Sequence, residues 1–221
     1  MGLNKIQMRK LIFLFILLLI PVGIILFLHR YGQNHYEIPV YFSNAADMSS
    51  DICVFPEGQH HVPVFAFTDQ DNRLVSEAWL EDKITVVDFI FTNCPTMCKD
   101  MSAEMLRVQE AFRDDSELQL LSFTVDPEYD QPRVLKEYAE RIGVKEDNWR
   151  FLTGDKSPLY DVARCGFLLP VQAGNSGSDD FIHSNKFILV DGQRRIRGYY
   201  DGDNRQEVDR LVQEIRILKM E

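Results

Sequence analysis

Residues 84–98 read ITVVDFIFTNCPTMC and join a strand to the start of a helix around two cysteines. The first eight residues are apolar almost throughout and β-branched at their start, which is typical of a strand buried on both faces. Pro95 fits the first turn of a helix running to about Phe112, because the N–H that proline lacks has no partner there anyway. The stretch therefore predicts a buried strand that gives way to a helix at Cys94 and Cys98.

Similar strand and helix patterns flank this stretch. In chain order we expect strands at 62–68 and 118–125, a helix at 131–142, a short helix at 157–165, a hairpin of strands at 186–190 and 195–200, and a last helix at 204–218. Glycine, serine, asparagine and aspartate dominate residues 170–180, which indicates a loop. This order predicts an α/β protein with a thioredoxin-like three-layer fold around a central mixed β-sheet.

An apolar segment near the N-terminus precedes this domain. Residues 11–28 carry no charge, and a helix of that length rises about 27 Å, close to the hydrocarbon thickness of a bilayer. Lys5, Arg9 and Lys10 come before it, which favours a cytoplasmic N-terminus and an exported C-terminal part. The alternative is a cleaved signal peptide, but the apolar run is long for one and no small-x-small cleavage site follows it.

We therefore expect four parts in the chain. They are a cytoplasmic N-terminus at 1–10, one transmembrane anchor at 11–28, a tether at 29–55 and the thioredoxin-like domain at 56–221. The domain is expected on the periplasmic or outer face of the cell membrane, held there by a single pass of the chain.

The part of the chain after Arg30 is strongly acidic. It holds all 34 acidic residues and 20 of the 24 basic ones, a net charge of −14. Such a charge is repelled by a phosphate backbone, so no nucleic acid is expected as a partner.

The four cysteines form one close pair and two isolated residues. Cys94 and Cys98 stand four residues apart at the predicted helix start, where unpaired N–H groups and the helix dipole favour the thiolate. On a helical turn their β-carbons lie ~5–6 Å apart, so both sulfurs reach one metal ion or each other. Cys53 and Cys165 are candidates for a disulfide in an oxidising compartment, although the sequence alone leaves the pairing open.

His183 is the candidate third ligand. It comes just before the predicted hairpin, and in a thioredoxin-like sheet that segment runs beside the turn that holds the cysteines. Two thiolates suit Cu(I), and an imidazole lets the site also hold Cu(II), whereas structural zinc normally takes four protein ligands. The residues therefore predict a copper site at Cys94, Cys98 and His183. A histidine with a purely structural role is the alternative if the fold differs.

Several other residues have two interpretations. Asp126 either orients a ligand or only forms a turn before proline. Met97 and Met101 could each supply a thioether during copper transfer, but Met101 fits the core more simply, and Met97 more simply covers the site. His60 and His61 make either a weak metal site or, more simply, an exposed loop pair.

Three ordered motifs give the chain a resemblance to a known family. Residues 87–98 resemble the strand and Cys-x-x-x-Cys copper motif of the Sco/SenC proteins, which help mature cytochrome c oxidase. Residues 123–132 (FTVDPEYDQP) are similar to the family's second strand and Asp-Pro turn, and His183 with the hairpin up to residue 202 resembles its ligand histidine and closing strands. The resemblance covers residues 62–202. It implies copper held by this histidine and the two cysteines, and the copper-bearing subunit of cytochrome c oxidase as partner.

Three functions fit these residues. The first is a copper metallochaperone that helps mature the dinuclear copper centre of the oxidase; the others are a thiol–disulfide oxidoreductase that reduces partner cysteines and a copper or redox sensor. The three-residue spacing within the pair and the lack of proline at 182–186 speak against a pure oxidoreductase. Because a dithiol that binds Cu(I) can also reduce a disulfide, an accessory reductase activity stays open. The metallochaperone is the preferred function, and whether the chain is also an enzyme is left open.

Overall fold

The computed structural model describes residues 5–32, 37–44, 53–55, 57–93, 97–144, 148–169 and 184–221, without the side chains of residues 31, 97 and 98. The chain consists of two units, Met1–Tyr36 and Glu37–Glu221. Helix α1 (Lys5–Tyr31) belongs to the first unit, and the other described helices and strands belong to the second.

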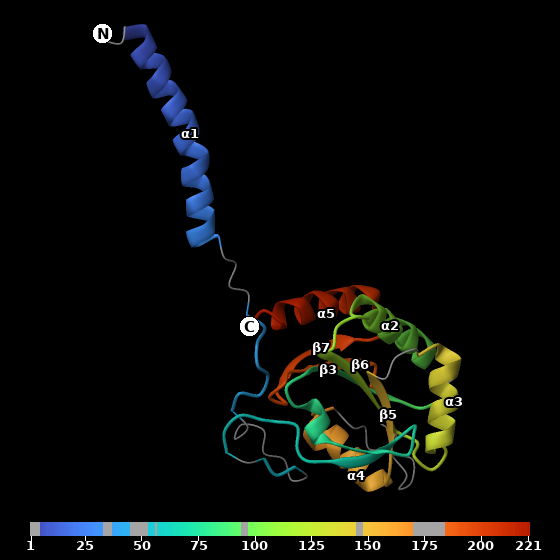
Figure 1. Ribbon diagram of the computed structural model, residues 1–221. Helices are drawn as coiled ribbons and strands as arrows, with labels where there is room; N and C mark the ends of the chain where they lie inside the picture. Colours follow the sequence, from blue (N-terminus) through green and yellow to red (C-terminus); the bar gives the residue numbers. More distant parts are fainter. Residues whose placement is uncertain are drawn as a thin grey trace. The chain divides into compact units, whose positions relative to one another are not determined.

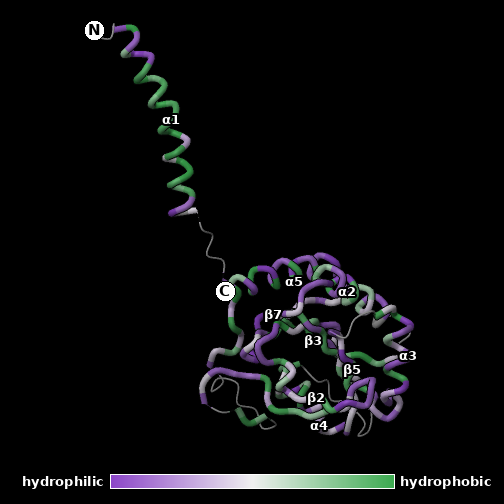
Figure 2. Tube along the Cα trace, in the orientation of Figure 1, coloured by the Kyte–Doolittle hydropathy of each residue, from purple (hydrophilic) through white to green (hydrophobic). Residues whose placement is uncertain are grey.

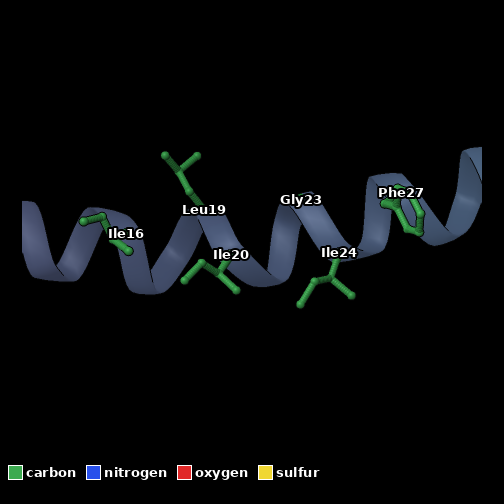
Figure 3. A pocket seen from close by; sticks show the side chains of 6 residues that line it. All are labelled: Ile16, Leu19, Ile20, Gly23, Ile24 and Phe27. Atoms are coloured by element: carbon green, nitrogen blue, oxygen red, sulfur yellow. The ribbon is translucent and has the colours of Figure 1, made fainter.

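Helix α1 is long and apolar enough to cross a membrane over Lys5–Arg30. Figure 2 shows its apolar middle between hydrophilic ends. Pro21 lies inside the helix, as membrane helices tolerate. A hollow of about 390 Å³ lies on one side of the helix at Gly23, which carries no side chain, and Figure 3 shows the residues that line it, Leu19 and Phe27 among them. The predicted apolar helix is present, and its apolar surface suits contact with lipid chains.

The second unit is built on one mixed β-sheet. Its strands lie in the order β2-β1-β5-β4-β3-β6-β7. β3, β4 and β5 are parallel to one another, and the outer strands pair antiparallel with their neighbours. All residues of β3 and β4 are buried, as predicted for strands covered on both faces. The strands are β1 (Ala66–Asp69), β2 (Leu74–Ser76), β3 (Ile84–Ile90), β4 (Leu118–Thr124), β5 (Trp149–Thr153), β6 (Lys186–Val190) and β7 (Ile196–Asp201).

Helices cover both faces of this sheet (Figure 1). α2, α3 and α5 pack on one face around a core that includes Val86 of β3, and α4 with η3 packs on the other face around a core that includes Val87. Neighbouring residues of one strand enter different cores because side chains alternate across a sheet. The predicted three-layer fold is confirmed. The helices are α2 (Met97–Ala111), α3 (Pro132–Ile142), α4 (Lys156–Asp161), α5 (Arg205–Leu218), the 3-10 helix η2 (Glu77–Leu80) and the π-helix η3 (Val162–Gly166).

The ends of the helices follow from the local sequence. α3 begins at Pro132, whose fixed φ suits the first helical position. It ends at Gly143, which adopts a left-handed φ of 92° that residues with a side chain rarely take. The side chain of Asn204 accepts a hydrogen bond from Gln206 N and so caps α5.

β5 has no counterpart among the predicted elements. Three of its five residues, WRFLT, are of types that favour strands, but so short a segment with a charged residue inside it shows no clear apolar period. β5 pairs in parallel with β4 and antiparallel with β1. Its extended conformation therefore depends on two neighbouring strands that the local sequence does not reveal.

Residues 37–44, 53–55 and 57–62 form a segment that we call the N-terminal strap. Ile38 is only 2% exposed, and Tyr41 N donates to Ile196 O of β7 (2.9 Å). Val62 N donates to Arg194 O (2.8 Å). Residues 29–55 were expected to act as a tether, but their described part from residue 37 onward packs on the domain, because burying Ile38 stabilises that arrangement.

Candidate metal centre

The carboxyl ends of β3 and β4 form the edge of the sheet at which the cysteine motif begins. Ile90, the last residue of β3, pairs with Thr124, the last residue of β4. From there the chain runs through Thr92 to Cys94, which lies outside the described residues. Cys98 lies in the first turn of α2 by its backbone, and its side chain is not described. The predicted change from strand to helix at the motif is confirmed.

β6 enters the sheet at this same edge. It runs antiparallel to β3, with Val87 opposite Ile188. Its first residue, Lys186, therefore lies toward the carboxyl end of β3. Ser184 is the first described residue before β6, and His183, the predicted third ligand, lies just outside the described part.

The structure thus brings together the backbone segments that flank the predicted ligands, but it does not describe the three ligand side chains. Within the described ranges, no three His, Cys, Asp or Glu side chains lie close enough together to hold a metal ion. The predicted loop at 170–180 also falls outside these ranges. The copper site at Cys94, Cys98 and His183 stays a prediction.

Asp130 lies beside this edge, and sequence reasoning did not single it out. Its side chain is fully buried. Thr124 Oγ1 donates to Asp130 Oδ2 (2.6 Å), and both Thr92 N (3.1 Å) and Thr92 Oγ1 donate to the same carboxylate. Burial raises the pKa of Asp130, while the hydrogen bonds from Thr124 and Thr92 act in the opposite direction. The sequence signal for it was its position four residues after Asp126, as a second aspartate in the turn that follows β4.

Asp88 is a second buried carboxyl group that the sequence reasoning did not single out. It lies within β3 and is 1% exposed. Ser122 Oγ donates to Asp88 Oδ1 (2.5 Å), and Trp149 Nε1 donates to Ser122 Oγ (2.8 Å). Burial raises the pKa of Asp88 to about 7. An acidic residue inside a run of apolar residues was the signal for it.

The two isolated cysteines form a disulfide. Cys53 of the strap is bonded to Cys165 of η3, with 5.5 Å between the Cα atoms. This is one of the pairings that the sequence left open. It joins two segments 112 residues apart in the chain.

The His60-His61 pair is not the exposed pair that the sequence predicted. His60 is only 4% exposed, its Nε2 lies 2.8 Å from Gly166 O, and its ring packs edge-on against Phe55. Burial lowers the pKa of His60. His61 is exposed, with its Nδ1 2.7 Å from Gln193 O. Because each ring binds a separate backbone carbonyl, the structure favours a structural role for both.

Asp126 forms the predicted turn, and Met101 follows the simpler of its two interpretations. The backbone carbonyl of Asp126 accepts hydrogen bonds from Tyr129 N (3.2 Å) and Asp130 N (2.8 Å), which closes the turn after β4. Met101 is 1% exposed and lies in the core under α2. The side chain of Met97 is outside the described residues.

Known proteins share both the sequence pattern and the fold. The sequence profile of the SCO1/SenC family matches residues 55–218. The SCO1 protein homolog of Bacillus subtilis (strain 168) is 33% identical over 159 residues, which cover 71% of this chain and 82% of the relative.

Solved structures agree with this match. BsSco, a member of the Sco family of cytochrome c oxidase assembly proteins in which a disulfide switch is identified, has a TM-score of 0.62 at 33% identity, over 72% of this chain and 93% of its own. Arabidopsis thaliana ScoI, solved with copper bound, shares the fold with a TM-score of 0.56 at 24% identity, over 70% of this chain and 98% of its own.

The profile match runs from the strap to the end of α5 and so includes every strand of the sheet. It contains the cysteine motif, the Asp-Pro turn and the closing hairpin in the order in which the chain presents them. A profile that covers nearly the whole second unit, together with the identity to the Bacillus subtilis homolog, shows that the chain belongs to the SCO1/SenC family.

Proposed function

We propose that this protein binds copper through Cys94, Cys98 and His183 and helps to assemble the dinuclear copper centre of a cytochrome c oxidase. One observation carries the proposal: β6 runs antiparallel to β3, so the chain enters β6 at the edge where it leaves β3. His183 stands three residues before the start of β6, and the segment just after β3 leads to Cys94. Two remote parts of the chain that lead to the proposed ligands, the end of β3 and the start of β6, thus lie at one edge of the sheet, which supports a shared site.

The chemistry of the three donors fits copper as a cargo. Two thiolates favour Cu(I), and the imidazole extends the same site to Cu(II). Cys98 lies in the first turn of α2, where the helix dipole favours the thiolate form that binds metal. Copper is also what the related Arabidopsis ScoI holds, and oxidase assembly is the role of the family to which BsSco belongs.

The membrane and the disulfide support a location outside the cytoplasm. α1 is able to anchor the chain, and the basic residues before it favour an N-terminus on the cytoplasmic side. The Cys53–Cys165 disulfide suits an oxidising compartment, which is where the domain then lies. The copper-bearing subunit of the oxidase is the proposed recipient on that face.

Copper loading of the full chain in detergent tests the ligand set. The wild-type chain is expected to bind one copper ion and, as Cu(II), to show thiolate-to-copper charge-transfer absorption. Cys94→Ser or Cys98→Ser removes that absorption, because the band needs both thiolates in place. His183→Ala loses Cu(II) but retains Cu(I), which two thiolates hold without the imidazole.

His61→Ala is the matched control. His61 is exposed, and its ring forms a hydrogen bond with the backbone carbonyl of Gln193. It is expected to bind copper as the wild-type chain does. Stoichiometric copper in the triple variant of Cys94, Cys98 and His183 contradicts the assignment. Transfer is then measured by mixing the loaded chain with the copper-free soluble copper domain of an oxidase subunit and following the absorption of the dinuclear centre.

A further inference from the structure

Thr92 is held through all three of its polar groups. Its N–H and its hydroxyl both donate to the carboxylate of Asp130. Its carbonyl accepts from Arg141 Nη2 of α3 (3.3 Å). The residue two positions before Cys94 is therefore fixed by side chains from the segment that follows β4.

Asp130 is itself fixed in place. Thr124 Oγ1 donates to it and at the same time accepts a hydrogen bond from Asp126 N (3.0 Å). Asp130 N donates to Asp126 O (2.8 Å), which anchors its backbone in the turn before α3. The carboxylate thus has three donors, which a fully buried charged group needs to offset its loss of hydration.

We propose that Asp130 is a positioning residue for the copper site: by holding Thr92 it sets the path of the chain into Cys94. This inference rests on the proposed function. The chain has only a short link between Thr92 and α2, which begins at Met97. The end of the link at α2 is held because α2 packs on the sheet through Met101. Asp130 holds the other end, at Thr92. Such supporting contacts around a metal site pre-organise its ligands.

Asp69 provides a matched control. It is also fully buried and also accepts from three donors: Asp71 N and Arg73 N of a turn (both 2.8 Å) and Arg150 Nη1, with which it forms an ion pair (2.9 Å). Asp69 lies on β1, which β5 and β4 separate from β3. Asp69→Asn therefore disturbs a comparable buried carboxylate at a place remote from the cysteine motif.

The first test compares Asp130→Asn with Asp69→Asn in the full chain in detergent. Asp130→Asn is expected to weaken Cu(II) binding by about tenfold or more and to shift the charge-transfer band, because the amide cannot accept from all three donors. Asp69→Asn is expected to keep the wild-type affinity and band even where it lowers the unfolding midpoint. Equal effects of the two substitutions, or a wild-type band in Asp130→Asn, overturn the proposal.

A second pair of variants covers the case in which Asp130→Asn does not fold. Thr92→Val removes the hydroxyl donor and keeps the shape, whereas Thr92→Ser keeps the hydroxyl. The valine variant is expected to lose Cu(II) affinity and the serine variant to retain it. If valine and serine behave alike, the hydrogen bond to Asp130 does not position the site.

A copper-free readout separates this inference from the proposed function. The equilibrium between the Cys94–Cys98 dithiol and its disulfide is measured against glutathione. Thr92→Val is expected to change the equilibrium constant by about tenfold, which corresponds to about 30 mV. If the wild-type chain binds no copper but this shift is present, the proposed function fails and the positioning role stands. If copper binds and neither readout moves, the positioning role fails alone.

Discussion

Asp88 carries an ionisable carboxyl group inside the strand that leads to the cysteine motif. Its only hydrogen-bond donor from a described side chain is the hydroxyl of Ser122, and Trp149 orients that hydroxyl in turn. Burial raises the pKa of Asp88 to about 7 from an ordinary value of 3.8. The folded chain therefore binds a proton at Asp88 between these two values, where the unfolded chain does not. This residue makes the domain less stable as the pH rises from 4 to 7.

Asp88→Asn is predicted to remove that pH dependence. The amide keeps the acceptor for Ser122 and carries no charge, so the variant is expected to be more stable than the wild-type chain at pH 8. The gain is about 4 kcal/mol at most for a displacement of this size and smaller at pH 5. Urea unfolding at both pH values checks it. Trp79 and Trp149 are the chain's two tryptophans, so their fluorescence follows the domain alone. A gain that is equal at pH 5 and pH 8 contradicts the assigned protonation.

The sequence predicted the roles that depend on residue type and spacing better than it predicted burial and long-range contacts. The cysteine pair, the isolated cysteines and Met101 followed from residue type and spacing. The burial of His60 did not, because its partner Gly166 lies 106 residues away. Asp130 was missed for a similar reason: its partner Thr92 lies 38 residues earlier, and only the parallel pairing of two strands brings them together.

At the scale of elements, strands with a long apolar run or a hairpin turn beside them could be predicted, and strands with neither could not. β3 and β4 are buried on both faces, and their sequences show it. β2 has three residues and β5 has five, and neither has such a run. Both are strands because neighbouring strands pair with them, and that pairing cannot be read from their own few residues.

The disulfide between the strap and η3 is predicted to stabilise the domain without taking part in copper binding. Replacing Cys53 and Cys165 by serine releases a constraint between segments 112 residues apart. The free energy of unfolding is expected to fall by about 2–5 kcal/mol, measured by urea unfolding at one pH. Copper stoichiometry is expected to stay at one ion per chain, because the proposed ligands are other residues. An unchanged unfolding midpoint, or lost copper in a folded variant, contradicts this division of roles.

At the scale of the molecule, the second unit begins earlier than the sequence suggested. Ile38 N donates to Glu221 Oε1 (2.9 Å), and Arg197 Nη2 donates to Ile38 O (2.6 Å). The start of the strap is thereby bound both to Glu221 and to Arg197 of β7. A boundary at residue 56 followed from composition alone, since the polar stretch before it shows no periodicity.

Two shortened chains test this boundary. A chain that starts at Glu37 is predicted to unfold at the same urea concentration as the domain of the full chain, since its contacts are complete. A chain that starts at residue 45 loses Ile38 and its hydrogen bonds but keeps Cys53. It is expected to be about 2–4 kcal/mol less stable, from one buried aliphatic side chain and the lost bonds. Equal stability of the two shortened chains shows that residues 37–44 do not belong to the folded unit.

The bond between Cys53 and Cys165 also makes the other two cysteines easier to study by thiol labelling. The chain has four cysteines, and this bond occupies two of them. A maleimide or iodoacetamide label added to the folded, non-reduced protein is thus left with one pair of targets. The number of labels per chain, read by mass spectrometry, reports whether that pair is free. A pair that is oxidised or shielded by a metal ion takes no label, and a chelator restores labelling only where a metal ion was the shield.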